Sequence, residues 1–395
     1  MAATGPLEGT RVIDLGGFVV GPSTAAIMAD WGADVVKIEP PDGDPNRAWT
    51  TDRNPTFELD NRGKRSVTLD LKVPEGIGVL LDLLATADVL VTNMRPRVLE
   101  SMGLDYQTLA DRFPRLIYAS ITGYGPVGPD RDRAAYDAGA FWSRAGVLAT
   151  MTRQGDGLPY TPGGSGDHIT AITTVAGISA ALASRARTGK GQLVSTSLFR
   201  AGIFTIGADM NSTLRLGKPL GSWRRTEVPN PLYNTYQCAD GRWVYLLGLQ
   251  PDRHWESLVA ALGTPELLVD PRFVGSRERA ANAAALIALM SEAFASASFE
   301  HWSARLSAHD VWWAPVQGPE DIVHDPQAIA AGAFVEAPVT EGTATTVATP
   351  VDFSGTPWGV ARRAPEAGEH TEEVLLERGL SWEQITELRG SGALG

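Results

Sequence analysis

The 395-residue chain has a single cysteine, Cys238, so it can form neither an internal disulfide nor a zinc site built from several cysteines. Its six histidines show no H-x-x-x-H or H-E-x-x-H spacing. The sequence also has no G-x-S-x-G elbow and no G-x-x-x-x-G-K-[ST] loop. A zinc hydrolase, a hydrolase with a serine elbow and a P-loop enzyme are therefore not expected, and we expect no metal site.

Basic residues are outnumbered: 34 Lys and Arg stand against 46 Asp and Glu, for a net charge of −12. A nucleic-acid partner is not expected, because binding phosphates along a strand needs clustered cations. A local basic pocket for a small anion stays open. The opening MAATGPLEGT lacks the apolar core of a signal peptide, and we find no run of 18 uncharged apolar residues. We expect a cytoplasmic protein without a membrane span.

Strands and helices alternate over the first 125 residues. Apolar segments predict strands at 11–15, 33–39, 64–70, 88–92 and 115–120, and the patterns at 22–31 and 74–87 predict helices. Nearly continuous apolar strands separated by helices indicate a parallel sheet that is covered on both faces. We therefore predict an α/β fold with a doubly wound, Rossmann-like large domain.

The composition changes after Arg200. A long helix over 168–187 and a strand over 192–195 precede a segment rich in Gly and Pro at 214–231. Asp240-Gly241 then predicts a hairpin between strands at 233–238 and 243–247, and helices follow to about residue 308. We place the first part of the large domain at 1–200, a linker at 201–228, a small α+β domain at 229–330, and a linker with a return to the large domain at 331–395.

Residues 160–168 (YTPGGSGDH) deliver a carboxylate to the start of the long helix. Glycines let a ligand approach the backbone, and a helix N-terminus offers unpaired N–H groups and partial positive charge. Such a setting keeps a carboxylate ionised and can stabilise an oxyanion beside it. Spacing alone favours Asp167 or Ser165 as a helix cap, with catalysis by Asp167 as the sharper alternative. Whether His168 takes part is left open.

The turn after the first strand, GGFVVG at 16–21, matches a dinucleotide fingerprint only in part, because Phe18 stands where G-x-G-x-x-G needs glycine. Glu39 sits where a ribose-binding acid would be. An adenosine-type ligand or a plain tight turn is favoured over NAD. Basic residues near strand ends can line a ligand crevice, and the first half of the chain has Arg47, Arg62, Lys64, Arg65, Arg95 and Arg97.

Taken together, the motifs of the chain resemble those of the class III CoA transferases, the group of formyl-CoA and carnitine CoA-transferases and the related α-methylacyl-CoA racemases. The resemblance runs in order over essentially the whole chain. The segments that carry it are PLEGTRVIDLGGFVVGPSTAAIMADWGADVVKIEPP at 6–41, NRGKRSVTLDLK at 61–72, VLVTNMRPRVLESMGLDY at 89–106, PRLIYASITGYGPVGP at 114–129, GDHITAITTVAGISAALASRARTGKGQLVSTSL at 166–198, APVQGPEDIVHDPQ at 314–327 and GEHTEEVLLERGLSWEQITEL at 368–388.

The resemblance implies a Rossmann-like large domain built from both chain ends, a smaller central α+β domain, and two chains interlocked as a ring-like homodimer. It implies acyl-CoA and a free carboxylic acid as substrates, and Asp167 as the catalytic residue. The carboxylate of Asp167 would attack the donor thioester and form a mixed anhydride. An aspartyl-CoA thioester would follow, from which the acceptor acid collects CoA.

The same resemblance implies which residues contact CoA: Val19, Val20, Arg62, Lys64, Arg65, Asn93, Arg95, Arg97, Tyr136 and Asp137. The chain departs from the formyl-CoA members at two places. Residues 226–231 hold no glycine where those members carry a glycine run, and Val19 stands near the position of a polar glutamine. Both departures argue against oxalate-type substrates and for a bulkier or less polar acyl group.

Two other functions stay open as alternatives. A racemase would use Asp167 as one base and a histidine as the other, but that histidine is Tyr136 here. Tyrosine, with an ordinary pKa of about 10, is a poor base at neutral pH, so the transferase is favoured. A non-catalytic CoA-binding protein is the third possibility, and the intact Asp167 segment argues against it.

Overall fold

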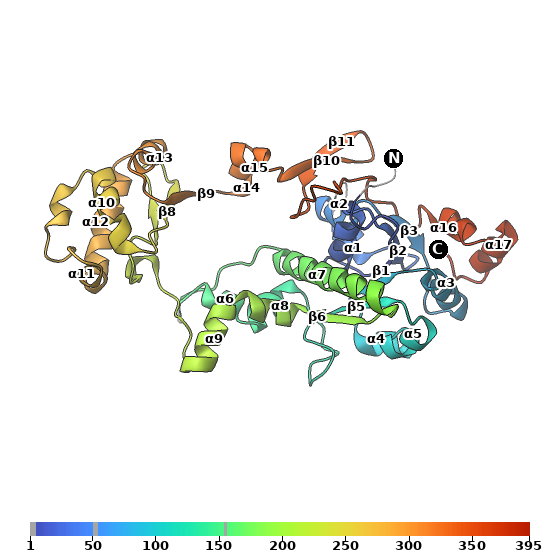
Figure 1. Ribbon diagram of the computed structural model, residues 1–395. Helices are drawn as coiled ribbons and strands as arrows, with labels where there is room; N and C mark the ends of the chain where they lie inside the picture. The colour runs from blue at the N-terminus through green and yellow to red at the C-terminus, as the bar shows by residue number, and fades with distance from the viewer. Residues whose placement is uncertain (1–4, 50–53, 154–155) are drawn as a thin grey trace. The chain divides into compact units, whose positions relative to one another are not determined.

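A computed structural model describes residues 5–49, 54–153 and 156–395 (Figure 1). Residues 1–4 lie outside the described residues. They belong to the predicted large domain and to the opening segment MAATGPLEGT. The chain divides into two compact units. Unit 1 comprises Met1–Ala149, Pro159–Pro219 and Gly332–Gly395, and unit 2 comprises Thr150–Leu158 and Leu220–Ala331.

Unit 1 is built on a six-stranded parallel sheet, as the alternating pattern predicts. The strands are β1 (Arg11–Leu15), β2 (Asp34–Glu39), β3 (Arg65–Thr68), β4 (Val89–Thr92), β5 (Ile117–Thr122) and β6 (Leu193–Ser197). They lie in the order β3-β2-β1-β4-β5-β6, and every neighbouring pair is parallel. The chain therefore builds outward from β1 in one direction and then from β4 in the other. The loops after β1 and β4 meet where that order reverses.

Helices cover both faces of this sheet. The helices in this part of the chain are α1 (Val20–Asp30), α2 (Pro55–Asn61), α3 (Pro74–Leu84), α4 (Pro96–Ser101), α5 (Tyr106–Arg112), α6 (Val147–Thr150), α7 (Ser165–Thr188), α8 (Leu198–Thr205) and α9 (Gly207–Leu216), with a 3-10 turn, η1 (Pro45–Trp49), and a π-helix, η2 (Ala138–Arg144). Residues 201–228, expected as a linker, thus contain most of α8 and all of α9.

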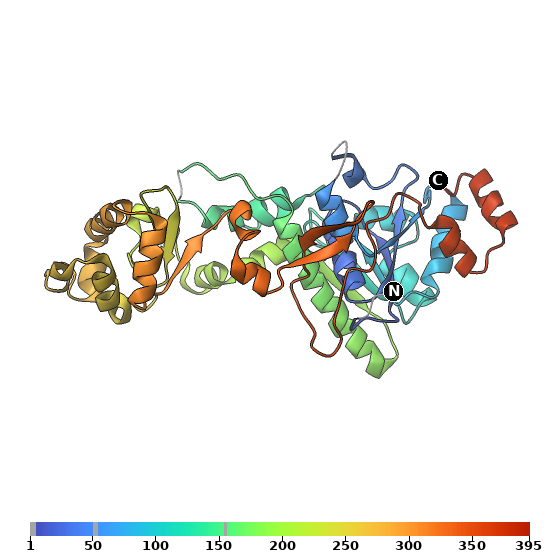
Figure 2. The ribbon, with the colours of Figure 1, turned by 90° about the horizontal axis from the view of Figure 1, so that it is seen from above.

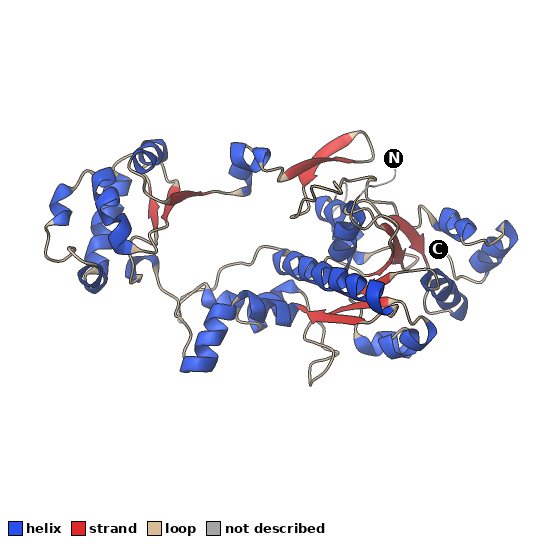
Figure 3. Cartoon of the chain, viewed as in Figure 1, coloured by secondary structure: helices blue, strands red, loops and turns tan. Residues whose placement is uncertain are grey.

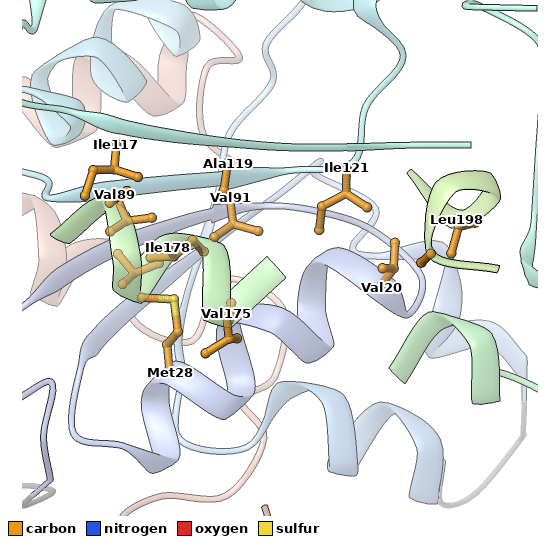
Figure 4. Packing of buried hydrophobic residues seen from close by; sticks show 14 of the residues in the cluster. Val20, Met28, Val89, Val91, Ile117, Ala119, Ile121, Val175, Ile178 and Leu198 are labelled. Atoms are coloured by element: carbon orange, nitrogen blue, oxygen red, sulfur yellow. The ribbon is translucent and has the colours of Figure 1, made fainter. Parts of the chain in front are cut away.

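The two faces have separate apolar cores because strand side chains alternate between them. Val89 and Val91 of β4 face one core and Leu90 faces the other. In Figure 4, Met28 of α1 and Ile178 of α7 lie against the β4 and β5 side chains of the first core. Helix α7 is long and apolar enough to cross a membrane by length and composition, a test that the core helix of a soluble protein also passes.

The end of the chain returns to unit 1. A hairpin of β10 (Phe334–Pro338) and β11 (Thr343–Val347) precedes α16 (Thr371–Glu377) and α17 (Trp382–Gly390). The amide of His370 donates to Ser66 O in β3 (2.9 Å), and Arg378 donates to Asp82 O (3.1 Å). In Figures 1 and 2 these C-terminal helices, drawn in red, lie beside α3. Residues from both ends of the sequence therefore share the second core.

Unit 2 is a small α+β fold. The predicted hairpin is confirmed: β7 (Thr235–Gln237) pairs antiparallel with β8 (Trp243–Leu246), and β9 (Trp313–Val316) adds a third strand. Figure 3 shows helices gathered around this short sheet. The helices of unit 2 are α10 (Pro251–Leu262), α11 (Ser276–Ala281), α12 (Ala283–Ala295), α13 (Phe299–Ala308), α14 (Pro319–Ile322) and α15 (Pro326–Ala330), with 3-10 turns η3 (Arg225–Glu227) and η4 (Pro265–Leu268). Of these helices, α10, α12 and α13 supply side chains to its apolar core.

Candidate active site

The loop after β1 and the loop after β4 are joined by one side chain. The amide of Gly17 donates to Asn93 Oδ1 (3.0 Å), and Asn93 Nδ2 donates back to Gly17 O (2.8 Å). Both residues lie at the carboxyl ends of strands, at the point where the strand order reverses. In open parallel sheets this is the place where ligands bind. Asn93, expected as a CoA contact, thus also fixes the backbone of the loop after β1 at this edge of the sheet.

Phe18 holds an unusual backbone conformation in that loop. Its φ of 61° lies in the left-handed region, which non-glycine residues seldom adopt. The amide of Phe18 donates to Asp44 Oδ1 (3.1 Å), and Asn46 Nδ2 donates to its carbonyl (3.2 Å). Its ring meets the ring of Tyr136 edge to face, with centroids 5.3 Å apart. A strained conformation held from several sides is characteristic of functional loops.

The start of α7 lies against this loop. A Cβ placed at Gly164 would be 3.7 Å from Val19 Cγ1 and 3.8 Å from His168 Cε1. Gly164 is the N-cap of α7, with a φ of +72° that favours glycine, and Ser165 and Asp167 lie within the first turn instead. The capping role that spacing alone favours for Asp167 or Ser165 is therefore wrong. The side chains of Val19 and Val20 are buried, so a ligand would meet the backbone there.

Asp167 is half-buried in the first turn of α7. The pKa of its carboxyl is raised to about 7. Burial is the largest cause, the nearby carboxylates of Asp137 and Asp60 also raise the pKa, and His168 lowers it. The first-turn amides have no partners within the helix, and the helix dipole there favours negative charge. Asp167 is thus a poorly solvated carboxylate beside N–H donors, which suits a nucleophile that passes through an oxyanion.

Asp137 packs beneath the first turn of α7. Its carboxyl is buried and accepts a hydrogen bond from Trp142 Nε1 (3.3 Å). Burial raises the pKa of Asp137, while the backbone amides of Gly166 and Gly164 lower it. A Cβ at Gly166 would be 2.2 Å from Asp137 Oδ1 and 2.4 Å from Phe141 Cγ, so only glycine permits this approach. Gly166 therefore allows Asp137 and Asp167 to share one site.

Asp60 is the site residue that sequence reasoning missed. It lies near the end of α2, is fully buried, and accepts a hydrogen bond from His168 Nε2 at 3.0 Å. The two residues are 108 positions apart, so no local pattern connects them. The available signal was an acidic residue directly before the NRGKR segment, in an otherwise amphipathic helix.

Three cations expected to contact CoA are paired with the chain itself. Lys64 is fully buried, and its Nζ lies 2.8–2.9 Å from Asp14 Oδ2, Pro22 O, Asp60 O and Asn61 Oδ1. Four acceptors engage all three of its N–H donors. Arg62 is paired with Asp30, and Arg65 with Asp34, Glu373 and Glu377. We therefore expect these three residues to support the fold rather than bind CoA.

Arg95 and Arg97 have a different placement. Both are exposed just after β4, and the described residues give neither side chain an ion pair. Tyr136 is also 63% exposed beside Phe18.

The carboxylate of Glu39 accepts hydrogen bonds from Arg47 and Ser66 and from the amide of Asp44. Its oxygens are therefore engaged within the protein, and the interpretation of Glu39 as a ribose-binding acid does not fit. In the described chain no three His, Cys, Asp or Glu side chains are grouped to hold a metal ion.

The sequence profile described as "CoA-transferase family III" matches residues 7–371. The chain belongs to this family. It is 35% identical over 395 residues to the (R)-2-hydroxy-4-methylpentanoate CoA-transferase of Clostridioides difficile, covering 98% of each chain. It is 31% identical over 399 residues to the cinnamoyl-CoA:phenyllactate CoA-transferase of Clostridium sporogenes, covering 98% of this chain and 96% of that protein.

A solved structure of a CAIB/BAIF family protein from Brucella suis is also similar. It matches with a TM-score of 0.85 at 32% identity, covering 95% of this chain and all of that one. The α/β fold with its parallel sheet is therefore the fold of this family, as the resemblance implied. These relatives identify the chain as an enzyme of the class III acyl-CoA:carboxylate CoA-transferase type.

Proposed function

We propose that this CoA-transferase works through covalent intermediates on Asp167. The observation that carries the proposal is the position of Asp167, in the first turn of α7 and against the loop that follows β1. Its raised pKa, about 7, reflects weak solvation, which favours attack by the carboxylate once it is ionised.

The reaction divides into four acyl transfers that need no net proton. Asp167 attacks the thioester carbonyl, CoA thiolate leaves, and a mixed anhydride remains. The thiolate then attacks the aspartyl carbonyl and releases the donor acid, leaving an aspartyl-CoA thioester. The acceptor carboxylate displaces CoA from Asp167 to form a second anhydride. CoA thiolate finally attacks the acceptor carbonyl, which yields the new acyl-CoA and restores Asp167.

An acyl group larger and less polar than oxalate fits the residues around Asp167. Phe18 and Tyr136 present aromatic surface, and Val19 stands near the position of a polar glutamine in the formyl-CoA members. Two relatives are named for a branched and for aromatic acyl groups. We propose branched or aromatic carboxylic acids, including 2-hydroxy acids, as the substrate class.

The proposal can be tested with a panel of acyl-CoAs and free acids, followed by mass spectrometry of the CoA products. We expect CoA exchange that depends on the acceptor acid, with branched or aromatic acids preferred over oxalate. In D₂O, we expect little deuterium at the α-carbon of a 2-methylacyl-CoA. Rapid α-deuteration without acceptor-dependent exchange would instead establish a racemase.

Arg95 and Arg97 are expected to bind the phosphates of CoA. Both arginines are exposed at the carboxyl edge of the sheet, beside the loop that Asn93 fixes, and guanidinium groups suit phosphate. Arg95→Ala and Arg97→Ala should each raise the KM for acyl-CoA by about tenfold with a smaller change in kcat. Arg112→Ala, an exposed arginine before β5 at the opposite edge, is the matched control. Unchanged KM values in both variants would place the phosphates elsewhere.

For the assembly we propose a homodimer, and for the location the cytoplasm. Large exposed apolar side chains on α8 and α9, Phe204, Leu214 and Leu216, support an interface, since such surface is costly to leave in water. Sedimentation analysis should give a dimer that persists on dilution. A stable and active monomer would contradict this part of the proposal.

A further inference from the structure

We propose that His168, anchored by Asp60, is a positioning residue that supplies the positive charge needed to keep Asp167 ionised. The inference rests on the proposed role of Asp167 as nucleophile. His168 follows Asp167 directly on α7, and the ring lies between Gly164 and Asp60. The Nε2 atom donates to Asp60 Oδ1 at 3.0 Å, which leaves Nδ1 as the second ring nitrogen of an imidazolium.

Asp60 is built into the fold as a fixed anchor. Its side chain is 1% exposed against 38% for His168, so the carboxylate is the rigid partner and the histidine reaches to it from the edge of the site. Lys64 Nζ donates to the carbonyl of Asp60 (2.8 Å) and pins the backbone as well. Among the described residues Asp60 Oδ2 has no hydrogen-bond partner. A buried carboxylate with one such partner strongly favours a charged imidazolium beside it.

The charges around His168 are carboxylates. They are Asp60 from α2, Asp167 from its own helix, and Asp137 before η2, and together they outweigh burial and raise the pKa of His168. The other elements packed on α7 add little. Asp30 of α1 is paired with Arg62, Arg144 of η2 with Asp130, and Arg200 of α8 is exposed.

Asp167 therefore shares its site with two other carboxylates and one cation. Asp137 and Asp60 both disfavour its ionised form, and His168 is the charge that opposes them. Loss of the imidazolium would leave three carboxylates together, and the reactive form of Asp167 would then need a higher pH. The bond between Asp60 and His168 thus serves the chemistry by holding a cation in place.

The test variant is His168→Gln, whose amide can still donate to Asp60 but carries no charge. Labelling of Asp167 with a carbodiimide, which reacts with the protonated carboxyl, is followed by mass spectrometry across pH and normalised to the exposed Glu256. We expect the labelling midpoint of Asp167 to move up by about one pH unit. Adding Asp60→Asn to His168→Gln should lower the labelling midpoint of Asp167 again. The second substitution removes the negative charge of Asp60, which disfavours the ionised form of Asp167.

Activity provides the second readout. The acidic limb of the kcat/KM profile should shift to higher pH together with the labelling midpoint. At pH values below this limb His168→Gln should therefore be about tenfold less active than wild type, and at about pH 9 its kcat/KM should be near that of wild type. Arg187→Gln, which removes one exposed positive charge from the far end of α7, is the matched control and should move neither. An unmoved labelling midpoint in a correctly folded His168→Gln protein overturns the inference. Wild-type protein that exchanges no CoA refutes the proposed function instead, and the labelling still decides the role of His168.

Discussion

Asp167→Asn should abolish CoA transfer while the protein keeps its fold. The amide has the shape of the carboxylate but cannot attack a thioester, so we expect kcat/KM to fall by about 10³-fold or more. Stability should change little, because Gly164, and not Asp167, is the N-cap of α7. The substitution would also remove one of three neighbouring carboxylates, since Asp137 and Asp60 lie close enough to raise the pKa of Asp167 in the wild-type protein. The measurement is the rate of CoA exchange over a range of acyl-CoA concentrations, from which kcat/KM follows, together with a thermal melt of each protein.

A trapping experiment separates covalent catalysis from electrostatic assistance. Wild-type protein incubated with acyl-CoA and hydroxylamine should lose activity and gain a mass adduct on the peptide that contains Asp167. Asp111→Asn, an exposed carboxyl on α5 before the opposite edge of the sheet, should behave as wild type in both assays. Retained exchange in Asp167→Asn, or an adduct on another residue, would remove Asp167 from the nucleophilic role.

The sheet could be predicted from the sequence because its signal is local. Apolar runs bounded by turn residues mark β1, β2, β4 and β5 to within one or two residues, and the hairpin of β7 and β8 follows from Asp240-Gly241. The helix predicted over 74–87 ends at Leu84 in the structure, and the one predicted over 168–187 begins three residues earlier, at Ser165. Local pattern indicated where helices lie but gave weaker information on where they end.

The candidate site was predictable only in part, because its parts come from distant segments. Asp167 and Asn93 lie at a helix start and a strand end, positions that periodicity can identify. Asp60 reaches His168 only through the fold, and the left-handed backbone of Phe18 depends on Asp44 and Asn46. Whether a cation is exposed or enclosed likewise depends on partners far away in the sequence. Lys64 was therefore assigned to CoA from the sequence, although the structure buries it.

Lys64→Met should destabilise the protein by about 3–5 kcal/mol, the usual cost of removing one partner from a buried ion pair. Burial lowers the pKa of Lys64 to about 8, against the effect of Asp14, and its Nζ lies close to four oxygens from three segments. Methionine fills a similar volume but leaves Asp14 and these carbonyls without their donor. Urea denaturation followed by tryptophan fluorescence should show a lower midpoint for the unit that contains the sheet.

Two further variants show whether the effect arises from the buried charge. Lys72→Met changes an exposed lysine eight residues away and should alter stability by less than about 0.5 kcal/mol. Adding Asp14→Asn to Lys64→Met should recover part of the loss, because the uncompensated carboxylate is then neutral. If Lys64→Met instead leaves stability unchanged and raises the KM for acyl-CoA, Lys64 contacts CoA after all. If the loss of stability comes with an unchanged KM in the folded protein, Lys64 supports the loop and helix that carry the site without touching the substrate.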